Sequence, residues 1–257
     1  MIQHTGITED FAQRGWQVTH RGAAPQRFQV FGERSSGTNF VKRLLGRNTP
    51  LQPIEDLGWK HGFAQMTAVP EDVALICVVR DARAWALSMH AKPWHCPPDM
   101  QALAFSDFLR AEWATVADRA RYFPQVAALG GLGQPLQHDR HPLTGAPFAN
   151  LFALRQAKLL GLLSFLRRGA SVVLCRLEAV QQAPERFLSD VCLGVGVESP
   201  AADYRPVMKR LGSKFKPAIP SRPATPDSLN ADDLAWLRAQ VDTAMEAALG
   251  YSYGTTP

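Results

Sequence analysis

The sequence predicts an α/β fold, in which a mainly parallel sheet is flanked by helices to form three layers. Three short apolar segments, 28–31, 72–80 and 171–176, have the composition of buried strands. Segments with the apolar spacing of helices alternate with them. Because strands that alternate with helices usually pair in parallel, we expect a single domain over residues 1–257, with its core at about 26–250.

Composition and charge limit the class of protein. The chain has 257 residues, of which 46% are hydrophobic and 20% charged, which excludes a disordered or fibrous chain. No segment approaches the roughly 18 apolar residues that span a bilayer, and the first residues contain no apolar leader. We therefore expect a cytoplasmic protein without a membrane span. The formal net charge of +5 suits a pocket for a small polyanion, and the scattered basic residues disfavour nucleic acid.

The cysteines indicate a reducing environment. The chain has four, and no two of them form a CxxC pair. They are Cys77, Cys96, Cys175 and Cys192. This number is too small for a disulfide scaffold, and the spacing does not match a zinc site. We therefore expect free thiols and no bound metal.

The first two strand and helix pairs lie in the N-terminal third of the chain. The β-prone segment 28–31 stops at Gly32, and after a polar loop the segment 40–45 has the apolar face of a helix. The segment 72–80, DVALICVVR, is a continuous apolar run typical of a strand buried on both faces. A helix is expected at 82–91.

The rest of the chain alternates between helices and loops. Further helices are expected at 101–123, at 150–168 before the third strand, from Pro184 onward, and at 232–249. Proline and glycine indicate loops at 93–98, at 124–149 and at 199–227. The first of these, PWHCPP, is expected to be a rigid lid.

The loop between the first strand and the first helix has the features of a phosphate-binding loop. Its residues 32–39 are Gly-Glu-Arg-Ser-Ser-Gly-Thr-Asn. Gly32 and Gly37 permit tight turns, and backbone N–H groups of such a loop bind phosphate oxygens at the positive end of the helix dipole. The alternative is an ordinary turn whose Ser and Thr residues cap the helix. Because of this loop, we expect the α/β fold to be a P-loop-like nucleotide-binding fold.

The loop departs from the nucleoside-triphosphatase pattern GxxxxGK[ST] in its second half. Thr38 stands where the pattern has lysine, and Asn39 where it has the magnesium-binding hydroxyl. Because that lysine meets the β- and γ-phosphates, its absence disfavours a P-loop kinase or nucleotide hydrolase. Such an enzyme would need Asp81 to hold magnesium.

A second anion-binding element is expected one strand later. The second strand ends in Arg80, and Ser88 lies eight residues further on, in the next predicted helix. A guanidinium at the carboxyl end of a strand binds phosphate or sulfate oxygens with two parallel hydrogen bonds. The alternative is a surface Arg80 paired with Asp81 and a solvated Ser88.

Together, the segments VFGERSSGTNFVKRLL and ICVVRDARAWALSMH resemble the sulfotransferases that use 3′-phosphoadenosine 5′-phosphosulfate. In that family a PKSGTTW-type loop binds the 5′-phosphosulfate, and an arginine at a strand end binds the 3′-phosphate with a serine eight residues later. The resemblance assigns the 3′-phosphate to Arg80 and Ser88. It assigns the 5′-phosphosulfate to Ser35, Ser36, Gly37, Thr38 and Asn39.

The resemblance extends over about residues 28–215. The segment 58–62, GWKHG, takes the place of the KTH segment that carries a catalytic histidine, which implies that His61 is the general base. The segment 172–180, VVLCRLEAV, is similar to the strand that enters the family's YEDL turn. Lys209 and Arg210 begin a loose match to its basic RKGxxG loop and would contact the donor.

The chain also departs from this family. The family loop has Lys or Arg two residues before its glycine, where this chain has Ser35. Either Arg34, one residue earlier, or Lys60, expected on the next strand, would replace that cation. The aromatic position of the YEDL turn is Leu177, which removes the ring expected to stack on adenine.

The resemblance implies a sulfotransferase that moves a sulfuryl group to a hydroxyl or amine of a small molecule or glycan. His61 would be the base, with Glu33 as a rival, and Lys60, Arg34 and the loop N–H groups would stabilise developing charge without a metal. Arg155 and Lys158, one helical turn apart, either line the pocket or lie on a solvated face. Two alternatives stay open: the kinase or hydrolase, and a non-catalytic module that binds RNA or another polyanion. The sequence does not indicate an acceptor or an oligomeric state.

Overall fold

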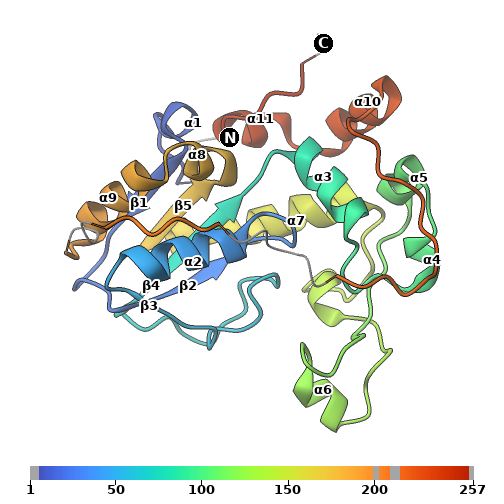
Figure 1. Ribbon diagram of the computed structural model, residues 1–257, viewed down its shortest axis with the longest axis horizontal. Coiled ribbons are helices and arrows are strands. Elements are labelled where there is room, and N and C mark those ends of the chain that lie inside the picture. Colours follow the sequence, from blue (N-terminus) through green and yellow to red (C-terminus); the bar gives the residue numbers. More distant parts are fainter. Residues whose placement is uncertain (1–5, 199–202, 209–214, 255–257) are drawn as a thin grey trace. The chain divides into compact units, whose positions relative to one another are not determined.

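The computed structural model describes residues 6–198, 203–208 and 215–254 (Figure 1). Its contacts divide the chain into two compact units. The sheet unit consists of Met1–Asp81, Lys158–Leu211 and Asp242–Pro257, and the helical unit of Ala82–Ala157 and Gly212–Val241. The single domain expected from the sequence stays a prediction.

The sheet unit contains a mostly parallel, five-stranded sheet in the order β1-β5-β4-β2-β3. Its strands are β1 (Trp16–Thr19), β2 (Arg27–Phe31), β3 (Gln52–Pro53), β4 (Val73–Val79) and β5 (Val172–Arg176). The pairs β3–β2, β2–β4 and β4–β5 are parallel, and the pair β5–β1 is antiparallel. All three strands expected from the sequence are confirmed; β1 and the two-residue β3 are additional.

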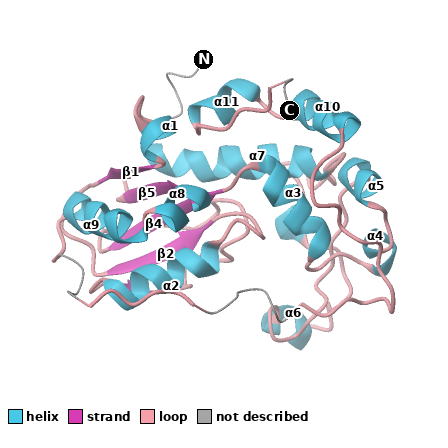
Figure 2. Ribbon diagram, turned by 45° about the horizontal axis from the view of Figure 1, so that its top comes forward, coloured by secondary structure: helices cyan, strands magenta, loops and turns pink. Residues whose placement is uncertain are grey.

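Helices cover both faces of this sheet (Figure 2). One face packs on α2 (Thr38–Asn48), α8 (Leu177–Gln182) and α9 (Pro184–Val195) in a continuous apolar cluster. On the other face, Phe31 contacts Phe165 of a short 3₁₀ helix, with 5.1 Å between ring centroids. That 3₁₀ helix follows α7 (Leu151–Leu163). The layered α/β architecture is therefore confirmed, and every residue of β4 is buried because both faces are covered.

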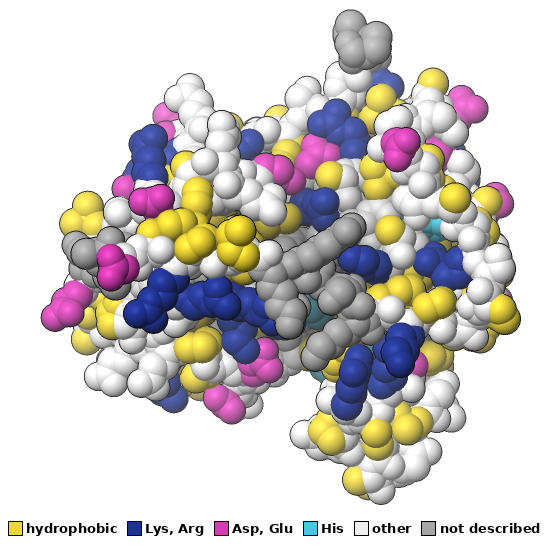
Figure 3. Space-filling view, in the orientation of Figure 1, with side chains coloured by type: hydrophobic (Ala, Val, Ile, Leu, Met, Phe, Trp, Pro, Cys, Tyr) yellow, Lys and Arg dark blue, Asp and Glu magenta, His cyan; other side chains and the backbone are white. Residues whose placement is uncertain are grey.

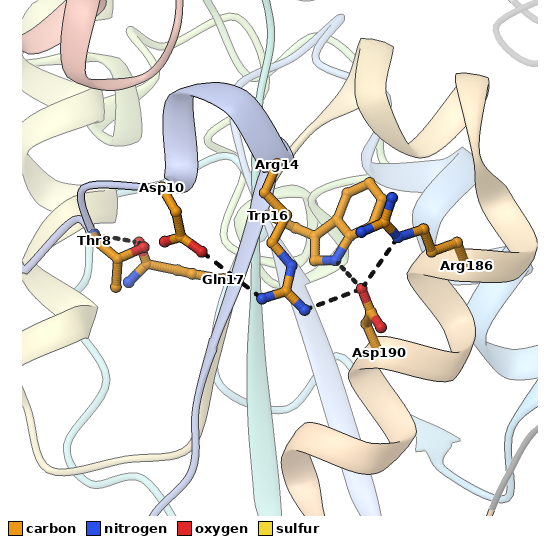
Figure 4. A network of polar contacts seen from close by, with 7 residues as sticks. All are labelled: Thr8, Asp10, Arg14, Trp16, Gln17, Arg186 and Asp190. Carbon is orange, nitrogen blue, oxygen red and sulfur yellow. Dashed lines mark hydrogen bonds and ion pairs between the residues drawn. The ribbon is translucent and has the colours of Figure 1, made fainter.

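A polar network around Asp190 ties the antiparallel edge strand β1 to helix α9 (Figure 4). Asp190, on α9, accepts hydrogen bonds from the indole Nε1 of Trp16 at 3.0 Å and from Arg14 at 3.1 Å. Arg14 ends the four-residue helix α1 (Phe11–Arg14) and also pairs with Asp10. Through these contacts α9 holds both α1 and β1.

The helical unit contains short helices joined by long loops. They are α3 (Ala82–Ala91), α4 (Pro98–Gln101), α5 (Phe105–Arg110), α6 (Pro124–Ala128) and α10 (Ala231–Gln240). The first turns of α7 also belong to this unit, whereas α11 (Thr243–Ala248) belongs to the sheet unit. Among the described helices, none is long and apolar enough to cross a membrane.

Two predicted helices are wrong in their extent. The helix expected at 101–123 reduces to the end of α4 and to α5, because the chain after α5 bonds to the following loop. Trp113 N–H donates to the carbonyl of Phe148 at 2.8 Å, and Thr115 Oγ1 donates to Asp139 at 2.8 Å. The helix expected at 232–249 breaks into α10 and α11, because the side chain of Asp242 caps the N-terminus of α11.

The loop at 93–98 forms a compact turn within the helical unit. His95 lies in the left-handed region with φ +68°, and its Nδ1 lies 2.7 Å from Asp118 Oδ1. The Trp94 ring contacts Tyr122 and Phe215 at centroid distances of 5.8 and 5.3 Å. The rigidity and the lid role expected for this loop both stay predictions.

The core of the sheet unit predicts a contrast between two identical substitutions. Leu44 on α2 has no exposed surface, whereas Leu193 on α9 is 82% exposed. Leu44→Ala is expected to lower the free energy of unfolding by about 2–5 kcal/mol, and Leu193→Ala by less than about 0.5 kcal/mol. Urea denaturation followed by circular dichroism measures both. Equal losses would show that Leu44 is not in the core.

Candidate anion-binding site

The loop after β2 has the conformation of a tight turn that opens a helix. Gly32 follows β2, and α2 begins at Thr38 and runs for 11 residues. Ser35 and Gly37 lie in the left-handed region, with φ +64° and +90°. The backbone N–H and the Oγ of Ser36 both donate to the carbonyl of Glu33, at 3.2 and 2.7 Å. The strand, loop and helix expected at this point are confirmed.

The two glycines of the loop are required by close contacts as well as by backbone angles. A Cβ at Gly37 would lie 2.3 Å from Leu177 Cδ1, and a Cβ at Gly32 would lie 2.5 Å from the carbonyl oxygen of Val78. Leu177, at the position of the expected adenine-stacking ring, is instead a buried side chain that packs on the loop. Larger residues would force the loop away from both β4 and α8.

Backbone N–H groups are available at the start of α2. Among the described residues, no atom accepts a hydrogen bond from the N–H groups of Ser35, Gly37, Thr38 or Asn39. The first N–H groups of a helix have no partner within the helix and carry its positive partial charge. These groups can therefore donate to the oxygens of an anion.

Arg80 connects the end of β4 to this loop. Its Nη1 donates to the carbonyl of Ser35 at 2.8 Å, and its side chain is half-buried. Burial lowers the pKa of Arg80, and the carboxylates of Glu178 and Asp81 oppose that effect; a guanidinium stays charged at neutral pH. Ser88 lies half-buried on α3 in the helical unit, so its pairing with Arg80 stays a prediction.

The turn at 58–62 is hydrogen-bonded to both ends of the loop. Lys60, expected on a strand, lies in this turn. The carbonyl of Lys60 accepts from the Gly32 N–H at 3.0 Å, and its ammonium donates to Asn39 Oδ1 at 2.7 Å. Burial lowers the pKa of Lys60, and Glu55 partly offsets this. Lys60 is therefore a cation placed at the first turn of α2.

His61 has one ring nitrogen held by the loop. Its Nδ1 lies 2.7 Å from the carbonyl oxygen of Gly32. Because a carbonyl only accepts, Nδ1 carries the hydrogen, and in the neutral ring Nε2 has the lone pair. Desolvation, and then Lys60, lower the pKa of His61 well below 6.5, with Arg34 and Lys158 adding to the effect. The histidine is thus a neutral base at neutral pH.

Two buried cations lie against the indole ring of Trp59, next to His61. The ring stands edge-on to His61 with 5.4 Å between centroids. The Arg34 guanidinium and the Lys158 ammonium lie 5.7 and 5.5 Å from the ring centroid, and each residue is 5% exposed. Lys158 Nζ also donates to the His61 carbonyl at 2.6 Å. The solvated face considered for Lys158 is therefore wrong.

The structure brings together part of the expected site. The loop, Lys60, His61, Arg34 and Arg80 lie in the sheet unit, and Glu33 is a half-buried member of the loop. Arg155 is 2% exposed and lies over Trp85 in the helical unit, so it is not on a solvated face either. Lys209 and Arg210 fall outside the described residues.

The sequence does not single out Trp59 as part of this site, and it gives Lys158 only as one of two alternatives, a pocket residue or a residue on a solvated face. Trp59 enters the sequence analysis only as part of the KTH-like segment. Lys158 lies on α7, and 97 positions separate it from His61 in the chain. The sequence marks Lys158 by its spacing of one helical turn from Arg155, and that spacing does not identify its neighbours.

The neutral state of His61 predicts a pH effect on stability. The unfolded chain has the usual histidine pKa, and the folded pKa is lower, so the unfolded state takes up the proton first as the pH falls. Stability is expected to fall as the pH drops below about 6.5 and to level off only below the folded pKa.

Chemical denaturation of wild type and His61→Asn between pH 7.5 and 5 measures this effect. The asparagine amide can still donate to the Gly32 carbonyl but does not titrate, so the variant is expected to lose less stability than wild type over this range. Identical pH profiles would show that His61 is not held in the neutral form.

Comparison with known proteins identifies no relative of this chain. No family model matches the sequence, and no curated protein or solved structure matches it. Functional assignment therefore depends on the loop after β2, the end of β4 and the turn at 58–62.

Proposed function

We propose that the chain is a sulfotransferase that moves a sulfuryl group from 3′-phosphoadenosine 5′-phosphosulfate to an acceptor. The observation that carries the proposal is the hydrogen bond from Arg80 to the Ser35 carbonyl. This bond links two proposed anion-binding elements, the N–H groups at the start of α2 and a guanidinium at the next strand end. A donor with phosphate groups at both its 5′ and 3′ positions is the ligand class that such a pair suits.

Cations around the loop support this proposal. The family's loop cation is replaced by Ser35, but Lys60, Arg34 and Lys158 all lie next to the loop or the turn that supports it. Positive charge held in a partly buried site stabilises the charge that develops on a leaving phosphate. Arg34, Lys60 and the loop N–H groups would therefore meet the sulfuryl oxygens and the leaving oxygen.

The tautomer of His61 supports a role as general base. In the proposed reaction an acceptor oxygen or nitrogen forms a bond to sulfur, while the bond from sulfur to the 5′-phosphate oxygen breaks. His61 Nε2 takes the acceptor proton, and adenosine 3′,5′-bisphosphate leaves. The Gly32 carbonyl holds Nδ1–H, so the lone pair at Nε2 is the one that can accept a proton. The acceptor is proposed as a small molecule or glycan with a hydroxyl or amine.

A thermal-shift experiment tests the two-element donor site. Adenosine 3′,5′-bisphosphate at about 100 times its dissociation constant is expected to add about 2.7 kcal/mol to the stability of wild type, or several degrees. Arg80→Ala is expected to lose most of this shift. Arg43→Ala is the control, because Arg43 lies exposed on α2. Figure 3 shows a row of Lys and Arg side chains on the surface over this helix.

Three outcomes would contradict the donor site. They are stronger stabilisation by ADP with magnesium, which favours a kinase or hydrolase; no stabilisation by either nucleotide; and equal shifts in wild type and Arg80→Ala. Binding that falls steeply with salt and ignores the 3′-phosphate would favour a polyanion-binding module.

An assay of sulfate transfer tests the base. With donor labelled in the sulfuryl group and a panel of phenols, sugars and amines, His61→Asn is expected to lower kcat by about 10²- to 10⁴-fold and to retain bisphosphate affinity. His20→Asn is the control, since His20 is an exposed histidine of the same unit. Unchanged turnover in His61→Asn would exclude His61 as the base and leave Glu33 as the candidate.

A further inference from the structure

A carboxylate from α8, the helix that follows β5, holds the end of β4. In the parallel pairing of β4 and β5, Val79 lies opposite Arg176, so the residues that follow the two strands leave the sheet side by side. Glu178, in the first turn of α8, accepts a hydrogen bond from the Asp81 N–H at 3.0 Å through Oε1. The residue next to Arg80 is thus tied to α8.

The second oxygen of this carboxylate is held by the C-terminal segment. Tyr251 donates its phenolic hydroxyl to Glu178 Oε2 at 3.0 Å, and its side chain is 6% exposed. Tyr251 follows α11, and its N–H donates to the Glu246 carbonyl at 2.8 Å. One carboxylate therefore joins the end of β4 to a residue 170 positions later in the chain.

Arg176, the last residue of β5, holds the same C-terminal segment in place. Its guanidinium donates to the carbonyls of Gly250 and Ala12, both within 3.1 Å, and lies 5.7 Å from the Tyr251 ring centroid. A Cβ at Gly250 would come within 2.6 Å of Arg176 Nη1. The tyrosine therefore has a defined position when it meets Glu178.

We propose that Glu178 and Tyr251 are positioning residues that hold Arg80 against the loop and so set selectivity for the 3′-phosphate of the donor. The inference rests on the proposed function, because it concerns the same anion site. Glu178 holds the Asp81 N–H, and the preceding residue, Arg80, extends to the Ser35 carbonyl. Without the tyrosine hydroxyl, the carboxylate is free to turn away from Asp81.

A structural role alone gives a different expectation. If Glu178 only favours the N-terminus of α8 and Tyr251 only fills space, their loss would lower stability and weaken all ligands alike. If they act through Arg80, their removal would weaken the binding of the ligand that carries a 3′-phosphate and leave the other ligand unaffected. The ratio of two nucleotide affinities separates the two cases.

The test compares affinities for adenosine 3′,5′-bisphosphate and adenosine 5′-phosphate by isothermal titration calorimetry on the full chain. Tyr251→Phe removes one hydroxyl and keeps the ring, and is expected to weaken the bisphosphate by about 3- to 10-fold with the monophosphate unchanged. Tyr253→Phe is the matched control, because Tyr253 also donates to a buried carboxylate, Glu246 Oε2, at 2.8 Å in the same segment. It is expected to leave the affinity ratio unchanged.

A double-mutant cycle shows whether the effect passes through Arg80. In an Arg80→Ala background, Tyr251→Phe is expected to change bisphosphate affinity no further. Additive losses, or equal losses for both nucleotides, would overturn the positioning role.

If the proposed function is wrong, wild type is expected to bind the two nucleotides equally, and this result differs from every outcome above. Amide hydrogen exchange of the segment at 80–82, measured without ligand, then decides the positioning role. Faster exchange in Tyr251→Phe than in Tyr253→Phe would support it, and equal rates would refute it.

Discussion

The position of β4 between β2 and β5 is the constraint on which the candidate site depends. All of its residues are buried, and parallel pairing on both sides brings the carboxyl ends of three strands to one edge of the sheet. The loop after β2, Arg80 after β4 and Glu178 after β5 all come from that edge. A parallel sheet concentrates functional groups at this edge because every crossover returns the chain to the opposite one.

Contacts from distant parts of the chain give the loop its shape. Leu177 packs on Gly37, the Lys60 carbonyl accepts from the Gly32 N–H, and His61 Nδ1 bonds the Gly32 carbonyl. These contacts fix the two ends of the loop, and between them Ser35 has a left-handed conformation, which costs a non-glycine residue of the order of 1 kcal/mol. The backbone N–H groups at the start of α2 are therefore oriented before any ligand binds, which lowers the entropy cost of binding an anion.

The charged side chains around Trp59 and the start of α2 make the electrostatic potential of the site positive. Arg34 and Lys158 are almost fully buried beside Trp59, and Lys60 is desolvated at the start of α2. Burying several cations close together is unfavourable unless partners or an anion offset the desolvation and repulsion. Desolvation lowers the pKa of His61 and keeps the ring neutral, and the positive charge of Lys60, Arg34 and Lys158 adds to this effect. An anionic ligand would relieve the repulsion, and a neutral imidazole beside it would be free to accept a proton.

The sequence by itself determined the strands β2, β4 and β5, the loop and its glycines, and helices α2 and α3, because continuous apolar runs and glycine spacing are local signals. Arg80 was singled out by its place at a strand end and His61 by the family resemblance, and their roles stay predictions. Only the tertiary structure decided that Lys158 contacts His61, that Lys60 lies in a turn, and that Tyr251 reaches Glu178. The helix expected at 101–123 failed for the same reason, since that segment bonds to a later loop. Contacts between residues far apart in the chain depend on packing, and single-sequence periodicity carries no information about them.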